Sequence, residues 1–472
     1  MTVQLSEPTL PLGAAFRLFV LRREGALALA ALLALSLVAL ALRILLMRKF
    51  QALGFFYLDD TLFNSDPKSM LDVFSHGARS LSIIYPEVRN SIHPYLWFYF
   101  GPAIRLIAKL CVALHLTHLG ELELRAALGV FVSPVVSALQ TFLLGVVLLV
   151  MRFPLRHVLL ISAFNVVTFS NLIFGSIPEH FALTSLAITI MMLIAVVSLR
   201  NPSVGRLRTW IAVGLLSVGI TISNVMALGV MHALSGIFAR KQPSLVRCLA
   251  VSGAFSAGVA LFVLASAHFI GVAMDGPLAP GSVRDNFVER YVRADAFTWQ
   301  GPGRALAAVG NAVAPSWKNV RTVAATAVPA PYDPALTVPF ETSPYPTFTF
   351  EPGADSEPRI GWLGLVALIG IAGGALVLAR RSRPCRLMAA SSAALLALTL
   401  VSHILWGDEF FIYSQHWMAA SILLLSGLLL LPQRVRPVTE AVFAVFLVAV
   451  AWNNVSVLTH LLAAARAAAS AA

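Results

Sequence analysis

Residues 26–47 read ALALAALLALSLVALALRILLM, an apolar run interrupted by one charge, Arg43. A helix that crosses a bilayer needs about 20 mostly apolar residues, so this run predicts a membrane-spanning helix. Arg17, Arg22 and Arg23 precede the run, and no clear small-residue cleavage site follows it. We therefore expect a retained helix rather than a cleaved signal peptide.

The composition extends this prediction to the whole chain. Of its 472 residues, 58% are hydrophobic and 12% charged, and the mean hydropathy is +0.82, outside the range of soluble globular proteins. The apolar runs are continuous rather than alternating, which excludes an outer-membrane barrel and predicts an all-α polytopic membrane protein. Eleven spans are expected, at residues 26–47, 126–150, 158–176, 180–199, 209–222, 224–239, 247–272, 360–379, 387–406, 414–432 and 438–458.

The positive charges predict how these spans are oriented. Residues 94–116 are apolar but carry Arg105, Lys109 and His115, and we expect them to form a surface-lying juxtamembrane helix. The basic links between spans then lie on the same side as the basic N-terminus, as the positive-inside rule requires, and with the three N-terminal arginines they hold half of the 34 Lys and Arg residues. Arg43 and its neighbours at the outer end of the first span are the exception. The scattering of these charges argues against nucleic-acid binding.

The expected organisation has three parts. Residues 1–272 form an N-terminal membrane module with a first large outer loop at 48–125. Residues 273–359 form a second outer loop, rich in proline and therefore irregular, and residues 360–472 add the C-terminal helices. The three cysteines, Cys111, Cys248 and Cys385, are far apart and indicate packing residues rather than disulfides or a zinc site.

The first outer loop carries an acidic pair, Asp59-Asp60, within residues 55–61 (FFYLDDT). A solvated loop pair is one interpretation. Two adjacent carboxylates among aromatics near a membrane repel each other, however, and this repulsion favours a raised pKa for one of them. A carboxylate with a raised pKa suits a general base.

Several motifs occur in the order found in GT-C-type membrane glycosyltransferases, and the chain resembles this family, which includes protein mannosyltransferases and aminoarabinose transferases. The resemblance covers about residues 25–240. Asp59-Asp60 resembles the family's acidic pair, and residues 90–99 (NSIHPYLWFY) resemble its His-Pro-Pro-Leu-Tyr-Tyr stretch, with Tyr95 in place of the second proline. Further matches are residues 124–129 (LRAALG), 175–180 (GSIPEH) and 221–224 (TISN).

The resemblance implies an enzyme that takes a sugar from a polyprenyl-phosphate donor at the outer face of the membrane. It implies Asp59 or Asp60 as the general base and Arg89 and Arg125 at the donor phosphate, with Arg105 and Lys109 as further candidates that could instead reach lipid headgroups. His93 would orient an Asp or touch the sugar, or simply precede a helix. Glu179 lies at a membrane boundary, where an unpaired carboxylate is costly, so a partner or a substrate hydroxyl is expected.

A later outer link, residues 406–416 (WGDEFFIYSQH), adds Tyr413 and His416 as substrate-binding candidates beside Asp408 and Glu409. An interfacial belt of aromatic and acidic residues is the alternative. No cofactor is required, although adjacent carboxylates could hold Mg²⁺ or Mn²⁺. The expected partners are a polyprenyl-phosphate sugar, a glycan, lipid or protein acceptor and membrane lipids. The expected location is a bacterial inner membrane, with the site facing outward.

Two other classes stay open. A transporter or flippase of a lipid-linked saccharide would share the outer acids, but it should show charged or broken helices, whereas these spans are expected to be nearly charge-free. A glycan ligase would instead use the loop at residues 273–359, with Arg284, Arg290 and Arg293.

Overall fold

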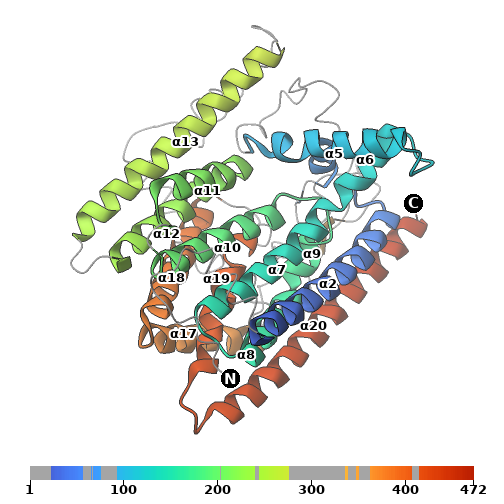
Figure 1. The fold of residues 1–472 in the computed structure, drawn as a ribbon. Helices are drawn as coiled ribbons and strands as arrows, with labels where there is room; N and C mark the ends of the chain where they lie inside the picture. Colours follow the sequence, from blue (N-terminus) through green and yellow to red (C-terminus); the bar gives the residue numbers. More distant parts are fainter. Residues whose placement is uncertain are drawn as a thin grey trace, which may run out of the picture.

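The computed structural model describes residues 23–56, 65, 67–75, 93–201, 204–239, 244–275, 335–337, 347–349, 362–406 and 414–471. Almost all of these residues are helical, and long apolar helices form the body of the structure (Figure 1). The chain is thus an all-α membrane protein in its described parts. A short antiparallel pair of strands, β1 (Ala335–Thr337) and β2 (Thr347–Thr349), is the exception, and it lies within the stretch expected to be an irregular loop.

Each expected apolar run is helical, and the run at residues 158–176 is divided between two helices. The helices that these runs form up to residue 275 are α2 (Arg23–Ala52), α7 (Val132–Val150), α8 (Leu155–Val167), α9 (Phe169–Phe174), α10 (Phe181–Ser198), α11 (Leu207–Ile220), α12 (Asn224–Ala239) and α13 (Leu245–Asp275). The C-terminal helices are α17 (Trp362–Ala379), α18 (Arg383–Trp406), α19 (Met418–Ser426) with the 3-10 turn η3 (Gly427–Leu430), and α20 (Arg436–Ala471).

Length and composition single out some of these helices as able to cross a membrane. Five stretches of the described chain are long and apolar enough to cross a membrane: Glu24–Ala52, Glu121–Val150, Phe181–Ser198, Leu245–Ala267 and Arg436–Ala467. Several other helices are apolar but shorter, among them α8, α11 and α12.

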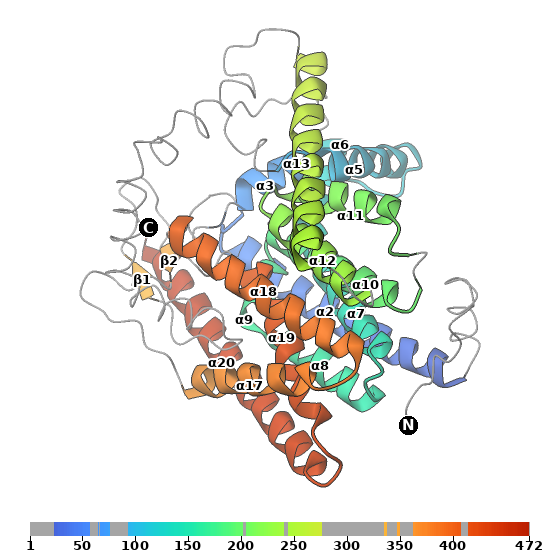
Figure 2. The same ribbon diagram turned by 90° about the vertical axis from the view of Figure 1, so that its left-hand side faces the viewer.

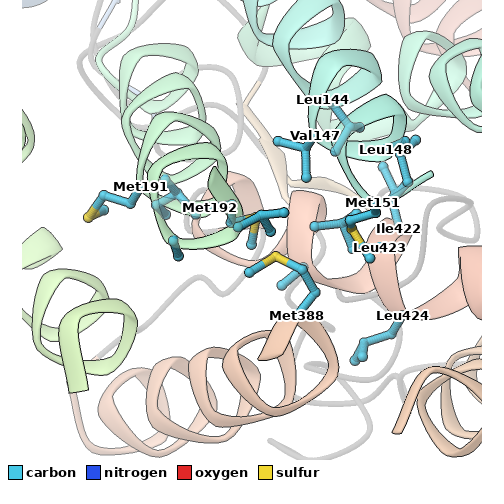
Figure 3. Close-up of a cluster of buried hydrophobic side chains, with 14 of the residues drawn as sticks. Leu144, Val147, Leu148, Met151, Met191, Met192, Met388, Ile422, Leu423 and Leu424 are labelled. Atoms are coloured by element: carbon cyan, nitrogen blue, oxygen red, sulfur yellow. The ribbon is translucent and has the colours of Figure 1, made fainter. Parts of the chain in front are cut away.

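The core lies where α7, α10, α18 and α19 meet. Figure 3 shows buried side chains of α7, Met192 of α10, Met388 of α18 and Leu423 of α19 gathered in this region, whereas Met191 points to the other side of α10. These side chains are almost fully buried. Close backbone approach helps to build this part of the bundle, because a Cβ added to Gly374 of α17 would lie 2.0 Å from the Leu424 carbonyl oxygen.

Three helices between residues 67 and 130 lie together at one end of the bundle (Figure 2). They are α3 (Pro67–Ser75), α5 (Leu96–Ala113) and α6 (Glu121–Val130), and they pack on one another. α5 buries Leu96, Ile104 and Ala108 on one face and exposes Leu106 and other apolar residues on the opposite one. Such a helix suits a bilayer surface, and α5 is not among the spans defined by length and hydropathy.

The basic links meet at the other end. Arg156 and His157, at the start of α8, contact Glu440 of α20 through atom pairs 2.8 and 2.5 Å apart. Arg381, in the link between α17 and α18, donates a hydrogen bond to the Leu430 carbonyl. Links that are distant in sequence therefore lie at the same end of the bundle. This arrangement is compatible with the expectation that the basic links lie on one side of the membrane.

The expectation of unbroken, nearly charge-free spans is wrong at one place. The run at residues 158–176 is interrupted at Thr168, whose ψ of 138° is extended, so that α8 ends and α9 begins inside the bundle. A broken helix exposes carbonyls that a membrane interior cannot solvate. Polar side chains from distant helices supply the missing donors: Arg43 binds the Val166 carbonyl at 2.5 Å and Asn454 the Val167 carbonyl at 2.7 Å.

Candidate functional site

The predicted site residues fall into two groups. Asp59, Asp60, Arg89 and Tyr413, as well as Asp408 and Glu409, lie outside the described residues. His93, Arg125, Glu179 and His416 are described, and all four are buried.

His93 is held where the chain enters α5. Its Nδ1 lies 2.9 Å from the Ile220 carbonyl oxygen at the end of α11. Two residues later the Tyr95 N–H donates a 2.8 Å hydrogen bond to the Gly219 carbonyl. The His-Pro stretch is therefore fixed to the end of α11 by two contacts, which orient the imidazole toward the bundle.

Glu179 is buried at the start of α10 and has partners on both sides. The His180 backbone N–H donates a 2.9 Å hydrogen bond to Glu179 Oε2, and His180 Nδ1 also lies 2.9 Å from that oxygen. The backbone of Glu179 is held by Ser133 of α7, whose hydroxyl accepts from its N–H and donates to its carbonyl, each at 3.1 Å. The expectation that this carboxylate has a polar partner is met by its neighbour.

The rings of His93 and His180 join these two segments, with centroids 3.9 Å apart. The His180 ring is also 4.0 Å from the Phe181 ring, centroid to centroid, with the two planes tilted by 40°, and Phe181 meets His416 edge to face at 6.2 Å. Ser223, in the turn between α11 and α12, lies 3.3 Å from His416 Nε2. We call His93, Glu179, His180, Ser223 and His416 the histidine cluster.

The cluster gathers four segments that are far apart in sequence: the start of α5, the α9–α10 link, the α11–α12 turn and the stretch before α19. Three of its members, His93, Glu179 and His416, were singled out from sequence. His180 was not, although its position directly after an acid at a membrane boundary was a usable signal.

Arg125 lies on α6, eight residues before Ser133, or roughly 12 Å along a helix. It is 4% exposed and pairs with Glu121 one turn earlier. Its Nε and Nη1 are buried and have no hydrogen-bond partner among the described residues. A guanidinium in this state can accept an anionic ligand. Of the two further basic candidates, Arg105 is partly buried and Lys109 is exposed.

A buried polar network lies beside the cluster and was not expected. Asn165 of α8 donates to Gln140 Oε1 at 2.8 Å and to Thr141 Oγ1 at 2.9 Å, both on α7. Gln415, directly before His416, donates to Ser170 Oγ at 2.6 Å and to Asn171 Oδ1 at 2.9 Å, both on α9. The network fixes the stretch that carries His416 to the broken helix.

Arg43 completes this polar interior. It is fully buried, and its Nε and Nη1 have no hydrogen-bond partner within the described parts of the chain. A Cβ on Gly175 would lie 2.8 Å from its Nε, so the guanidinium packs directly on that glycine. Its contact with the end of α8 places a cation where the helix dipole is negative, which helps to offset the cost of burying the charge.

No group of three or more His, Cys, Asp or Glu side chains suited to a metal ion occurs among the described residues, the histidine cluster included. The cysteines Cys111, Cys248 and Cys385 are unpaired thiols. Comparison of the sequence with protein-family models and with curated proteins gave no match.

Proposed function

We propose that the chain is a membrane glycosyltransferase that transfers a sugar from a polyprenyl-phosphate donor to an envelope glycan, lipid or protein, with a GT-C-like arrangement of eleven spans. The histidine cluster is the observation that carries the proposal. It joins the His93-Pro94 stretch to the buried Glu179 at the end of the bundle opposite the basic links. A polar centre of this kind suits recognition of sugar hydroxyls beside an apolar membrane.

The proposed mechanism assigns the proton transfer to the acidic pair. Asp59 or Asp60 accepts the proton of the acceptor hydroxyl as its oxygen attacks C1 of the sugar, and the bond from C1 to the phosphate oxygen breaks on the opposite face. The leaving polyprenyl phosphate keeps the electron pair of that bond. Arg89 and Arg125 stabilise its charge, a role that the buried nitrogens of Arg125 support.

The remaining candidates bind and orient the substrates. His93, Glu179, Tyr413 and His416 contact the sugar or the acceptor. A divalent cation at Asp59-Asp60 is compatible with this scheme, which does not depend on it. The proposed location is a bacterial inner membrane with the active site outward.

A transporter or flippase of a lipid-linked saccharide is the second candidate. The break between α8 and α9 and the buried charge of Arg43 favour it, because transporters use discontinuous helices and intramembrane charges at their substrate sites. A glycan ligase that works through residues 273–359 is the third.

Substitution of the acidic pair separates these classes. Purified full-length protein in nanodiscs would be supplied with a panel of polyprenyl-phosphate sugars and with acceptors from a strain that lacks the gene. For a transferase, Asp59→Asn or Asp60→Asn should reduce turnover by roughly 10² to 10⁴-fold, as expected for loss of a general base, while donor binding persists. Asp72→Asn, which makes the same change in the same expected outer loop, is the matched control.

Normal turnover in both single variants would contradict the proposed mechanism. Movement of the labelled lipid across proteoliposome membranes, unchanged in the Asp59→Asn and Asp60→Asn variants, would instead support the transporter. Lipid and glycan profiles of the deletion strain would name the acceptor, because the sugar should be missing from one envelope component.

A further inference from the structure

A cavity of about 470 Å³ lies between the ends of α10, α11, α12 and α13. These ends face away from the histidine cluster, which contacts the opposite ends of α10, α11 and α12. Trp210 of α11, His232 of α12 and Cys248 of α13 line the cavity. Figure 1 shows α12 and α13 side by side in this region, with α13 on the outside of the bundle.

Hydroxyl and imidazole groups make part of the cavity wall polar. Ser198 of α10 and Ser235 of α12 are joined by a 2.8 Å hydrogen bond between their hydroxyls. His232 Nδ1 lies 2.8 Å from Ser252 Oγ of α13. The polar groups are thus held in place by one another across three helices, so the wall is organised in advance of any ligand.

Among the described residues that line the cavity, the one formally charged side chain is positive. Arg247 lines it, and Arg206 and Arg208 are exposed at the nearby start of α11. No Asp or Glu occurs in the sequence between Glu179 and Asp275. The positive charge at this end of the four helices is therefore not balanced by any acid within them, which favours an anionic occupant.

We propose that this cavity binds the phosphate headgroup of an anionic membrane lipid from the adjacent leaflet. Arg247 holds the phosphate, since an arginine can contact two phosphate oxygens at once. Basic pockets between membrane helices are suited to such headgroups, and a volume of this size falls within the range of ligand sites.

The apolar surface beside the cavity suits the rest of a lipid. Trp210 and Val251 contribute apolar wall, and Val246 and Leu249 are exposed on α13 next to Arg247. An acyl chain can lie along this face while the headgroup occupies the polar part. A soluble anion such as inorganic phosphate gains nothing from these contacts, so the lipid should bind more tightly.

This site is separate from the proposed transfer site. α10 has 18 residues and thus spans roughly 27 Å between its two ends. The lipid therefore does not compete with a donor at the histidine cluster, and its binding is measurable whether or not the chain is a transferase.

The test uses purified full-length protein stripped of lipid in detergent. Native mass spectrometry would follow binding of phosphatidylglycerol and of phosphatidylcholine with the same acyl chains. In parallel, the rate at which a maleimide modifies Cys248 would be measured in a Cys111→Ser, Cys385→Ser background. Phosphatidylglycerol should bind in preference and slow the modification of Cys248, because this thiol lines the cavity.

Two variants and one control address the site itself. Arg247→Gln should weaken phosphatidylglycerol binding roughly fivefold, the effect of one basic residue on an anionic lipid. Arg434→Gln makes the same change at an exposed arginine of another basic link and should bind as the wild type does. Gly236→Leu should fill the cavity, because the nearest atom to an added Cβ is Cys248 Sγ at 3.9 Å, and should abolish binding while the protein still elutes as a single folded species.

Equal binding by the Arg247→Gln and Arg434→Gln proteins, or full binding by folded Gly236→Leu protein, would overturn the proposal. Protection of Cys248 by inorganic phosphate as strong as that by phosphatidylglycerol would also overturn it, since the occupant would then be a soluble anion.

Discussion

Gly219 allows the link between the fold and the candidate site to be tested with one added methyl group. It lies near the end of α11, where its carbonyl accepts the Tyr95 N–H hydrogen bond. A Cβ at this position would lie 2.3 Å from Tyr99 Oη, 2.6 Å from Tyr95 Cδ2 and 3.0 Å from Tyr95 Cβ. Ordinary contact begins at 3.4 Å, so Tyr95 Cβ must move away by a few tenths of an ångström and the other two atoms by more.

Side-chain rotation can move Tyr99 Oη and Tyr95 Cδ2, but it cannot move Tyr95 Cβ. The Cβ of Tyr95 is fixed by its own backbone, and the backbone N–H of Tyr95 donates a hydrogen bond to the Gly219 carbonyl. We therefore expect Gly219→Ala to lower the free energy of unfolding by about 1–3 kcal/mol, the usual cost of overpacking. Because His93 is two residues from Tyr95, its imidazole should also move relative to His180, and a displacement of about 1 Å in a catalytic arrangement can cost 10²-fold in rate.

Thermal unfolding in one detergent measures the first effect, and hydrogen exchange of the peptide containing residues 93–99 measures the second. Exchange at the Tyr95 N–H should accelerate. Gly253→Ala is the matched control, because nothing lies within 4 Å of an added Cβ on Gly253 and alanine favours a helix. The Gly219→Ala protein could instead have the melting temperature of the Gly253→Ala protein and the wild-type hydrogen-exchange rate at the Tyr95 N–H. In that case the start of α5 is not fixed by α11 as described.

Three further predictions concern the bundle. Gly374→Ala should destabilise the protein by about 3 kcal/mol or more, since its Cβ would lie 2.0 Å from the Leu424 carbonyl oxygen, and chemical unfolding against Gly253→Ala checks this value. Glu440→Gln should cost about 1–3 kcal/mol, because it removes a charged acceptor from the buried His157, and a melting temperature equal to the wild type would contradict that contact. A cysteine introduced by Pro154→Cys in a protein without other cysteines should react with an impermeant maleimide only from the cytoplasmic side; labelling from outside would refute the eleven-span topology.

The sequence by itself determined the class of the protein and most helix positions. The run at residues 180–199 became α10 (Phe181–Ser198), and the segment with Arg105 and Lys109 became the separate helix α5. These predictions succeed because the length and hydropathy of a run are local properties. A stretch that must leave water and satisfy its own backbone has few structures other than a helix.

Only the tertiary structure decided where polar groups enter the interior. Thr168 interrupts a run that reads as continuous, because donors from α2 and α20 satisfy the carbonyls that the break exposes. Arg43 lies in the last part of its span, and only the tertiary structure shows that it is buried against α8 and Gly175. Such partners come from more than a hundred residues away, so no local pattern contains them.

The candidate site divides in the same way. Sequence singled out His93, Glu179 and His416 one at a time, from the chemistry of each residue and its place beside a span. Their meeting, and the presence of His180 between His93 and Glu179, follow from the packing of α5, α10, α11 and α19. The sequence gives the chemical type of each side chain, but the distance between two side chains depends on how the helices that carry them pack.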